Sequence, residues 1–237
     1  MRTAPDILDT LRSGELRLTG LLPRASNYTF LGEVSADGGS LPVVYKPREG
    51  ETPLWDFPQG TLCQREVAAY VVASALGWPN VPPTVLRDGP HGEGSVQLFV
   101  DAEAGEHYYT LRERRPGDFR AVAAFDMVVG NGDRKSGHCL LGIDGQIWVI
   151  DHGLCFNDRA ALRTVIWEFA GEPVPPDLLD DIRGLHRDLR EGNLTARLLG
   201  LLSAAELDAM VLRAQELIAA ERFPSPGPGR SQPWPAV

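Results

Sequence analysis

The sequence has few cysteines, no long apolar run and no excess of basic residues, and each shortage excludes a class of protein. Three cysteines in 237 residues, with no CxxC pair, are too few for a disulfide framework or a structural zinc site. No stretch of about 18 apolar residues occurs, and the polar N-terminal segment lacks a signal-peptide core. A formal net charge of −9 gives no basic surplus for nucleic-acid binding. We therefore expect a cytoplasmic protein with no nucleic-acid partner and no integral membrane association.

Lysine is rare: of the 23 basic residues, two are lysines, Lys46 and Lys135. Genomic base composition explains most of this preference for arginine. A lysine is nevertheless a compact point charge and an arginine a wide fork, so the two are not interchangeable at a phosphate. The two lysine positions are therefore candidates for a functional role.

Apolar residues make up 43% of the chain, which is enough to bury the core of one large domain or two small lobes. Hydrophobic periodicity and turn residues predict a short helix at 5–12, strands at 15–22, 27–34, 41–47, 81–86 and 95–100, and a helix at 61–77. Beyond residue 101 they predict helices at 118–129, 160–170, 177–190 and 203–221. The Pro/Gly-rich end of the chain is expected to fray.

A hairpin is predicted where two apolar runs flank Asp144-Gly145, a typical two-residue turn. Counting outward from this turn places His138 directly opposite Asp151, with Cβ atoms about 4.5–5.5 Å apart. Asp133 lies in a polar, Gly-rich loop just before His138, and burying such a loop is costly unless its groups are paired or functional. Asp133, His138 and Asp151 are therefore expected to converge, either as a metal or proton-transfer site or as a structural His–Asp hydrogen bond.

Lys46 is another charged residue in apolar surroundings, since it lies near the end of the apolar segment 41–47. Glu66 lies on an otherwise apolar face of the predicted helix 61–77, where a carboxylate needs a cation. Glu51 and Asp56 are competing partners. The simpler interpretation is an exposed lysine at the end of a strand.

The order and spacing of these residues resemble the phosphatidylinositol 3-/4-kinase-like superfamily of atypical kinases, which includes bacterial toxin-type Ser/Thr kinases. The matching features are a strand lysine (Lys46), a helix glutamate (Glu66), the DRKSGH stretch at 133–138, the hairpin and the IDHG stretch at 150–153. The sequence is most similar to an actinobacterial family of uncharacterised kinase-like proteins that share NxDRKxGH and IDHG. The resemblance spans residues 15 to 160, roughly, and implies a two-lobed, protein-kinase-like α+β fold.

The resemblance also implies a division into an N-terminal nucleotide-binding lobe at 1–100 and a C-terminal catalytic lobe at 101–222. The composition adds a Pro/Gly-rich tail at 223–237. It implies ATP and Mg²⁺ or Mn²⁺ as cofactors. The acceptor would carry a hydroxyl, as a small polyol or inositol-type head group or as a protein Ser/Thr.

Residue roles follow from the same resemblance. Lys46 would contact the nucleotide phosphates and Glu66 would hold it in place. Asp133 would orient or deprotonate the acceptor hydroxyl, and Lys135 would neutralise the transferred group. Asp151 would bind the metal, with His138 as a second ligand. The remaining candidates would contact the nucleotide: Ser26 and Asn27 over the phosphates, and Gln97, Phe99 and Val100 against the adenine.

The sequence departs from the superfamily at His138, where the superfamily usually has an asparagine that binds a second metal. Imidazole suits softer metals than Mg²⁺, so His138 is either a metal ligand or a hydrogen-bond partner of Asp151. Three alternatives to a kinase stay open. They are a nucleotide-binding pseudokinase module that regulates a partner, transfer of AMP on the same fold, and a metal-dependent hydrolase built on Asp133, His138 and Asp151.

Overall fold

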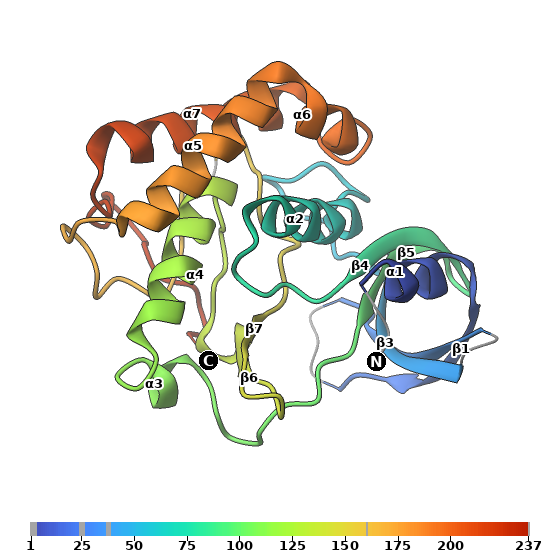
Figure 1. The fold of residues 1–237 in the computed structure, drawn as a ribbon. Coiled ribbons are helices and arrows are strands. Elements are labelled where there is room, and N and C mark those ends of the chain that lie inside the picture. The colour runs from blue at the N-terminus through green and yellow to red at the C-terminus, as the bar shows by residue number, and fades with distance from the viewer. Residues whose placement is uncertain (1–3, 24–26, 37–38, 160, 237) are drawn as a thin grey trace.

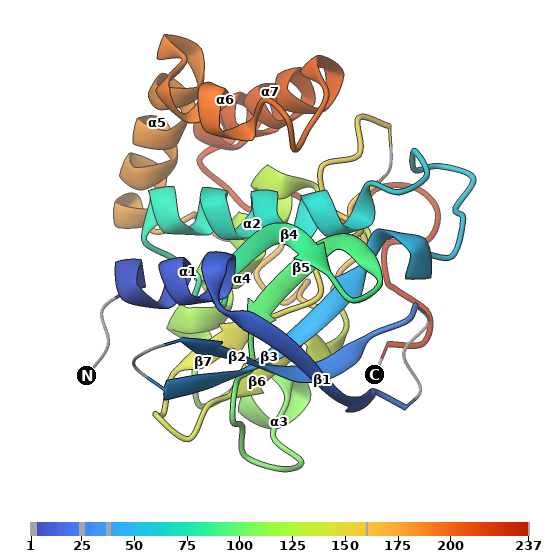
Figure 2. The same cartoon turned by 90° about the vertical axis from the view of Figure 1, so that its right-hand side faces the viewer.

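The computed structural model describes residues 4–23, 27–36, 39–159 and 161–236, which form a sheet lobe and a helical lobe (Figure 1 and Figure 2). The elements in chain order are α1 (Ala4–Ser13), β1 (Glu15–Leu21), β2 (Phe30–Ala36), β3 (Gly39–Pro47), η1 (Arg48–Gly50), α2 (Leu62–Leu76), β4 (Thr84–Gly89), β5 (Gly92–Leu98), α3 (Tyr108–Leu111), α4 (Pro116–Val129), η2 (Ser136–His138), β6 (Cys139–Leu141), β7 (Ile147–Val149), α5 (Pro176–Glu191), α6 (Asn193–Leu198) and α7 (Ala204–Ala220). This is the two-lobed α+β architecture that the resemblance implied.

The sheet lobe consists of five antiparallel strands in the order β1-β2-β3-β5-β4. Helix α1 packs on one face of the sheet, and a small apolar core that includes Leu11, Val34, Val43 and Tyr45 joins the two (Figure 2). Side chains of a strand alternate between its two faces, so Lys46 points away from this core. The sheet therefore directs Lys46 toward α2 and the helical lobe.

Helix α2 connects the lobes, since it contacts β4 and β5 on one side and α5 and α6 on the other (Figure 1). Most of its residues are buried, as expected for a helix covered on several faces. It ends at Gly77, whose φ of 81° is a left-handed conformation that glycine adopts without steric cost. Glu66 on α2 is thus held at the junction of the two lobes.

The helical lobe encloses the larger core, in which Phe119, Phe125, Ile182 and Met210 are buried side chains. The short β6–β7 hairpin lies between α4 and the sheet lobe (Figure 1). No helix in the described part of the chain is long and apolar enough to cross a membrane.

The helix predicted at 160–170 is wrong, because residues 161–170 form turns and extended segments. Their backbone groups bond to other parts of the chain: Arg163 O accepts the N–H of Arg134, and Val165 N–H donates to Arg134 O. The β-branched run 164–166 also lowers helix propensity. Tertiary hydrogen bonds therefore replace the helical ones here. Conversely, the short helices α3 and α6 were not predicted.

The predicted hairpin is present, but its register is wrong by one residue. Leu141 pairs with Ile147 and Cys139 with Val149, so residues 142–146 form a longer connection than a two-residue turn. Backbone bonds close this connection, from Gly142 N–H to Gln146 O at 2.9 Å and from Gly145 N–H to Gly142 O at 2.8 Å. Within it, Asp144 Oδ1 accepts the N–H of Gln146 at 3.0 Å, a local turn made by the side chain. In this register the backbone of His138 bonds to Ile150, through Ile150 N–H and His138 O at 3.0 Å.

The C-terminal segment was expected to fray, but Phe223 and residues 231–236 make contacts with the helical lobe, whereas residues 224–230 are exposed. Phe223 and Pro233 are buried, and Ala236 packs against the core of the helical lobe.

Candidate functional site

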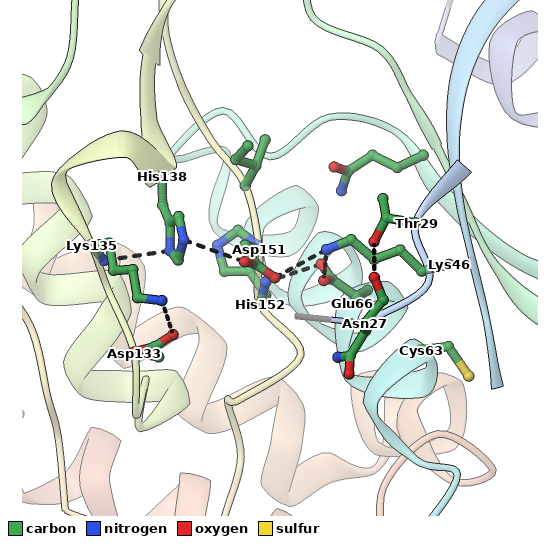
Figure 3. Close-up of polar contacts among 12 residues, drawn as sticks. Asn27, Thr29, Lys46, Cys63, Glu66, Asp133, Lys135, His138, Asp151 and His152 are labelled. Carbon is green, nitrogen blue, oxygen red and sulfur yellow. Dashed lines mark hydrogen bonds and ion pairs between the residues drawn. The ribbon is translucent and has the colours of Figure 1, made fainter. Parts of the chain in front are cut away.

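The ammonium group of Lys46 lies between carboxylates that come from two different elements (Figure 3). It forms an ion pair with Glu66 of α2, and its Nζ lies 3.0 Å from Asp151 Oδ1, just after the β6–β7 hairpin. The predicted pairing of Lys46 with Glu66 is confirmed. The competing Glu51 instead accepts the backbone N–H of Cys63 at 2.8 Å. Lys46 therefore joins the sheet lobe to the segment that follows the β6–β7 hairpin in the helical lobe.

Glu66 also supports the backbone that carries Asp151. Its side chain is only 3% exposed, and Oε2 accepts the backbone N–H of His152 at 3.0 Å. Asp151 has a φ of 61°, a left-handed conformation that is uncommon outside glycine but enriched in Asp and Asn. Such a conformation persists where neighbouring contacts fix it. Glu66 therefore fixes the position of the Lys46 ammonium group and, through the N–H of His152, the backbone conformation next to Asp151.

The charges of this cluster reinforce one another. Burial alone would lower the pKa of Lys46, but the charges of Asp151 and Glu66 raise it above its usual value. The charge of Lys46 in turn holds the pKa of Asp151 well below its usual range. The Asp151 side chain is 49% exposed, so solvent and ligands can reach a carboxylate that stays ionised. Such a group can exchange one cationic partner for another.

His138 lies next to the second carboxylate oxygen of Asp151. Burial lowers the pKa of His138 to about 4, which leaves the imidazole neutral. The backbone N–H of Lys135 lies 3.4 Å from Nδ1, so Nδ1 is the acceptor and Nε2 carries the proton. Nε2 lies 3.3 Å from Asp151 Oδ2. The two residues are therefore in contact, and both roles considered for His138 stay predictions.

Asp133 and Lys135 form a second pair beside the first (Figure 3). Lys135 Nζ lies 3.2 Å from Asp133 Oδ2, and both side chains are 24% exposed. Burial raises the pKa of Asp133 above its usual value, although the charge of Lys135 opposes this. A carboxylate with a raised pKa accepts a proton more readily than an ordinary aspartate. Asp133 therefore has the properties of a base that solvent can still reach.

A fully buried polar network lies behind these residues, centred on Arg134. Its guanidinium pairs with Asp126 of α4 at 2.9 Å, and neither side chain has exposed surface. Arg134 Nη1 donates to Ile150 O at 2.9 Å, and Nη2 lies 2.9 Å from His152 Nε2. A guanidinium has no acceptor, so this imidazole nitrogen accepts. The network ties the loop of Asp133 to the segment of Asp151.

Asn131 extends this network to Asp133, because its Nδ2 donates to Asp126 Oδ1 and its Oδ1 accepts the N–H of Asp133, both at 2.9 Å. The sequence analysis missed Asp126, Arg134 and His152 as positioning residues. A signal was present: Asp126 is an acid inside the apolar helix 118–129, the same anomaly that identified Glu66.

The other candidates for nucleotide contact have different surroundings. Ser26 lies outside the described residues. The side chain of Asn27 accepts the N–H of Thr52 at 2.8 Å, which links the β1–β2 connection to the segment after β3. The amide of Gln97 is buried and donates to Thr84 Oγ1 at 2.8 Å. The side chains of Asn27 and Gln97 thus have partners outside the Lys46 cluster.

Phe99 and Val100 lie where β5 leads into the helical lobe. Phe99 is 40% exposed, and its N–H donates to Pro42 O at 2.9 Å. Val100 is half-buried. Both residues thus lie at the connection between the lobes with part of their surface exposed.

Neither of two sizeable cavities in the described residues is lined by Lys46 or Asp151. One of about 310 Å³ lies beside Tyr28, Phe30 and Pro47, and one of about 250 Å³ lies between residues 51–60 and the start of α2. Because Lys46 and Asp151 touch, they close the space between themselves in this structure.

A closed metal site is also absent from the described residues, since no three His, Cys, Asp or Glu side chains are grouped to hold a cation. Protein sites for Mg²⁺ commonly supply one or two carboxylates and leave the other positions to phosphate and water. The half-exposed, ionised Asp151 fits a site of that open kind.

Together, the sheet lobe, the helical lobe and the connecting α2 define a two-lobed, kinase-like protein, and solved structures agree. A Golgi casein kinase covers 97% of this chain with a TM-score of 0.58 at 15% identity, over 77% of its own length. A second structure of that kinase, with Mn/ADP bound, covers 92% of this chain and 75% of its own, with a TM-score of 0.58 at 14% identity. CtkA, a proinflammatory kinase of Helicobacter pylori, covers 89% of this chain and 95% of its own, with a TM-score of 0.53 at 13% identity.

The chain belongs to the same family as Protein Rv2133c of Mycobacterium tuberculosis, with 41% identity over 261 aligned residues, 95% of this chain and 94% of that protein. Phosphatidylinositol 4-kinase gamma 4 of Oryza sativa subsp. japonica is 30% identical over 146 residues, which are 52% of this chain and 26% of the plant protein. No family model matches the chain.

Proposed function

We propose that this protein is a phosphotransferase that uses ATP and a divalent cation to phosphorylate a hydroxyl group. The observation that carries the proposal is the contact of Lys46 with both Glu66 and Asp151 between the lobes, with Asp133 and Lys135 alongside. The likeness to a plant phosphatidylinositol 4-kinase and to a Golgi casein kinase with Mn/ADP bound supports it. We place the chain in the phosphatidylinositol 3-/4-kinase-like superfamily on the same grounds.

In this proposal Lys46 exchanges its contact with Asp151 for the nucleotide phosphates, while Glu66 keeps the ammonium in position. Asp151 is then free to bind Mg²⁺ or Mn²⁺, which would screen the charge of the phosphates. Phe99 and Val100 would contact the adenine, with Gln97 behind them in β5, and the connection that carries Ser26 and Asn27 would cover the phosphates. Residues 1–100 act as the nucleotide-binding lobe and 101–222 as the catalytic lobe.

For the transfer itself, the oxygen of the acceptor hydroxyl bonds to the γ-phosphorus while Asp133 accepts the proton of that hydroxyl. The bond from the γ-phosphorus to the bridging oxygen of ADP breaks, and ADP leaves with that oxygen. Lys135, 3.2 Å from Asp133, is placed to compensate charge on the transferred group. The acceptor class is a small polyol or inositol-type head group, or a protein Ser/Thr.

A second candidate function is a nucleotide-binding module without turnover. One observation favours it: at the position where the superfamily has a metal-binding asparagine, the neutral His138 lies 3.3 Å from Asp151. Asp151 would then be the main protein ligand of the cation, and one metal rather than two would be bound.

The test is ATP binding and ATP consumption by the purified chain with Mg²⁺ and with Mn²⁺. Metal-dependent binding with turnover supports the phosphotransferase, and binding without turnover supports the module. The mass of a labelled product separates phosphoryl from adenylyl transfer, and activity without nucleotide would support the hydrolase alternative.

Two matched variants separate the proposed roles. Asp151→Asn should abolish both metal-dependent nucleotide binding and turnover, because an amide is a poor ligand for the cation. Asp133→Asn should retain nucleotide binding and lose turnover by about 10²–10⁴-fold, the usual contribution of a general base. If Asp133→Asn turns over like the parent chain, Asp133 is not the base.

A further inference from the structure

The C-terminal end of the described chain contacts the loop that carries Asp133. After α7 the chain returns across the helical lobe and ends near β6 (Figure 1). There, Ala236 O accepts the backbone N–H of Ser136 at 2.9 Å, across 100 positions of sequence. We call residues 131–138 the acceptor loop and residues 231–236 the C-terminal strap.

The bonded N–H begins a short helix. Ser136 is the first residue of η2, and the N–H groups of a first helical turn have no partner within the helix. The strap supplies the missing acceptor, and Ser136 is fully buried beneath it. Lys135 immediately precedes Ser136, and His138, which contacts Asp151 at 3.3 Å, is the last residue of the same turn. A shift of Ser136 would therefore move both functional neighbours.

A second contact holds the strap in place. Ser231 O accepts the backbone N–H of Thr164 and the indole N–H of Trp167, both at 3.0 Å. The segment around Thr164 in turn pairs with Arg134 of the acceptor loop. The strap thus reaches the acceptor loop directly at Ser136 and indirectly through Thr164.

We infer that the C-terminal strap is a positioning element of the phosphoryl-transfer site, holding the acceptor loop in its active geometry through the Ala236–Ser136 hydrogen bond. This inference rests on the proposed function. An inhibitory strap would cover the proposed base, yet Asp133 remains 24% exposed, and the strap's largest side chain, Trp234, is 80% exposed. The hydrogen bond between the strap and the acceptor loop uses the backbone carbonyl of Ala236, which supports the loop without placing a side chain over Asp133.

The first experiment truncates the chain after Arg230 and compares it with the full chain and with Trp234→Ala. The probes are MgATP and MnATP, with water as the acceptor. We expect the truncation to lower turnover about tenfold or more while the nucleotide Kd changes less than about threefold, because only the transfer geometry is disturbed. Hydrogen exchange at the amides of Ser136 and Thr164 should become faster. Trp234→Ala should match the full chain in all three measurements.

Ser136→Pro tests the single hydrogen bond with the strap in place. Proline lacks the N–H but suits the first position of a helical turn, so the backbone need not change. We expect the same loss of turnover, with exchange at Thr164 still slow. Ser136→Ala keeps the N–H and should leave the exchange of Thr164 and of residue 136 as in the full chain.

Unchanged turnover in both the truncated chain and Ser136→Pro would overturn the inference, and so would a rise in turnover, which identifies an inhibitory segment. If the full chain binds no nucleotide or does not turn it over, the proposed function fails instead. Hydrogen exchange at the amide of Ser136 then decides whether the strap supports the acceptor loop. If truncation leaves this exchange unchanged, the strap does not support the loop and the inference is refuted.

Discussion

The cluster around Lys46 and the network around Arg134 both join distant segments by charge, but they differ in exposure. Asp151 of the first cluster is half-exposed, and Lys46 is partly exposed. Asp126 and Arg134 of the second have no exposed surface, and their partners are all internal groups. An ion pair that solvent reaches contributes little to stability, whereas breaking a buried pair leaves an uncompensated charge.

This difference in exposure gives the two regions different tasks, although some of their residues are close together in the sequence. The buried network fixes the relative position of the acceptor loop and the Asp151 segment. Its groups have no exposed surface, so water cannot replace the partners that they have inside the protein. The exposed cluster can exchange partners with a ligand at low cost. A site that must bind and release a charged substrate needs both properties.

The largest effect is expected from breaking the buried pair. Asp126→Ala should lower the free energy of unfolding by about 3–5 kcal/mol, because Arg134 remains buried without its carboxylate. Urea unfolding measures this change. The double variant Asp126→Leu with Arg134→Met should recover part of the lost stability yet remain inactive, because the bonds to Ile150 and His152 are gone. A loss below about 1 kcal/mol in the single variant would mean that the pair stabilises the fold no more than an exposed ion pair does.

Lys46→Met should affect activity more than stability. We expect turnover to fall about 10²–10³-fold, because a cation that stabilises the phosphates is lost. Lys46→Arg should restore activity poorly, because the guanidinium is wider than the ammonium group. Steady-state ATP consumption and urea unfolding on the same samples give both quantities. If stability falls further than it does in Asp126→Ala, the contrast between the two regions is wrong.

The smallest effect concerns pH. The pKa of His138 is about 4 in the folded chain and about 6.5 when unfolded, so only the unfolded chain binds this proton between those values. Stability from this group is therefore present above pH 6.5 and lost as the pH falls toward 4, by about 3 kcal/mol at most. His152, whose pKa is also lowered by burial, acts in the same direction. Urea midpoints of the parent chain and His138→Asn measure this, and the variant should show the flatter profile. Parallel profiles would contradict the assignment.

Several parts of the fold were predictable because their signals are local. Alternating side chains placed the strands of the sheet lobe, and an acid on an apolar helix identified Glu66 as the partner of Lys46. Local signals were insufficient where backbone groups bond at long range. Residues 163–165 bond to Arg134 instead of forming a helix, and the strap bonds to Ser136 and Thr164 instead of fraying.

The contact between His138 and Asp151 shows the same limit. The sequence predicted the contact from a register in which the two residues are opposite, but His138 is opposite Ile150. The left-handed backbone at Asp151 brings its carboxylate to His138 nevertheless.

From the sequence alone, periodicity predicted most strands and helices, and the lysine positions, the acid on an apolar helix and the hairpin singled out Lys46, Glu66, Asp133 and Asp151. The two-lobed α+β architecture followed from the resemblance that these residues carry. Only the tertiary structure decided how these residues are held: by a left-handed turn at Asp151, by the buried Asp126–Arg134 pair and by a strap from the far end of the chain. The reason is physical. Side-chain periodicity is set by neighbours a few positions away, whereas a buried polar group is satisfied by whichever partner the completed fold brings within hydrogen-bond distance.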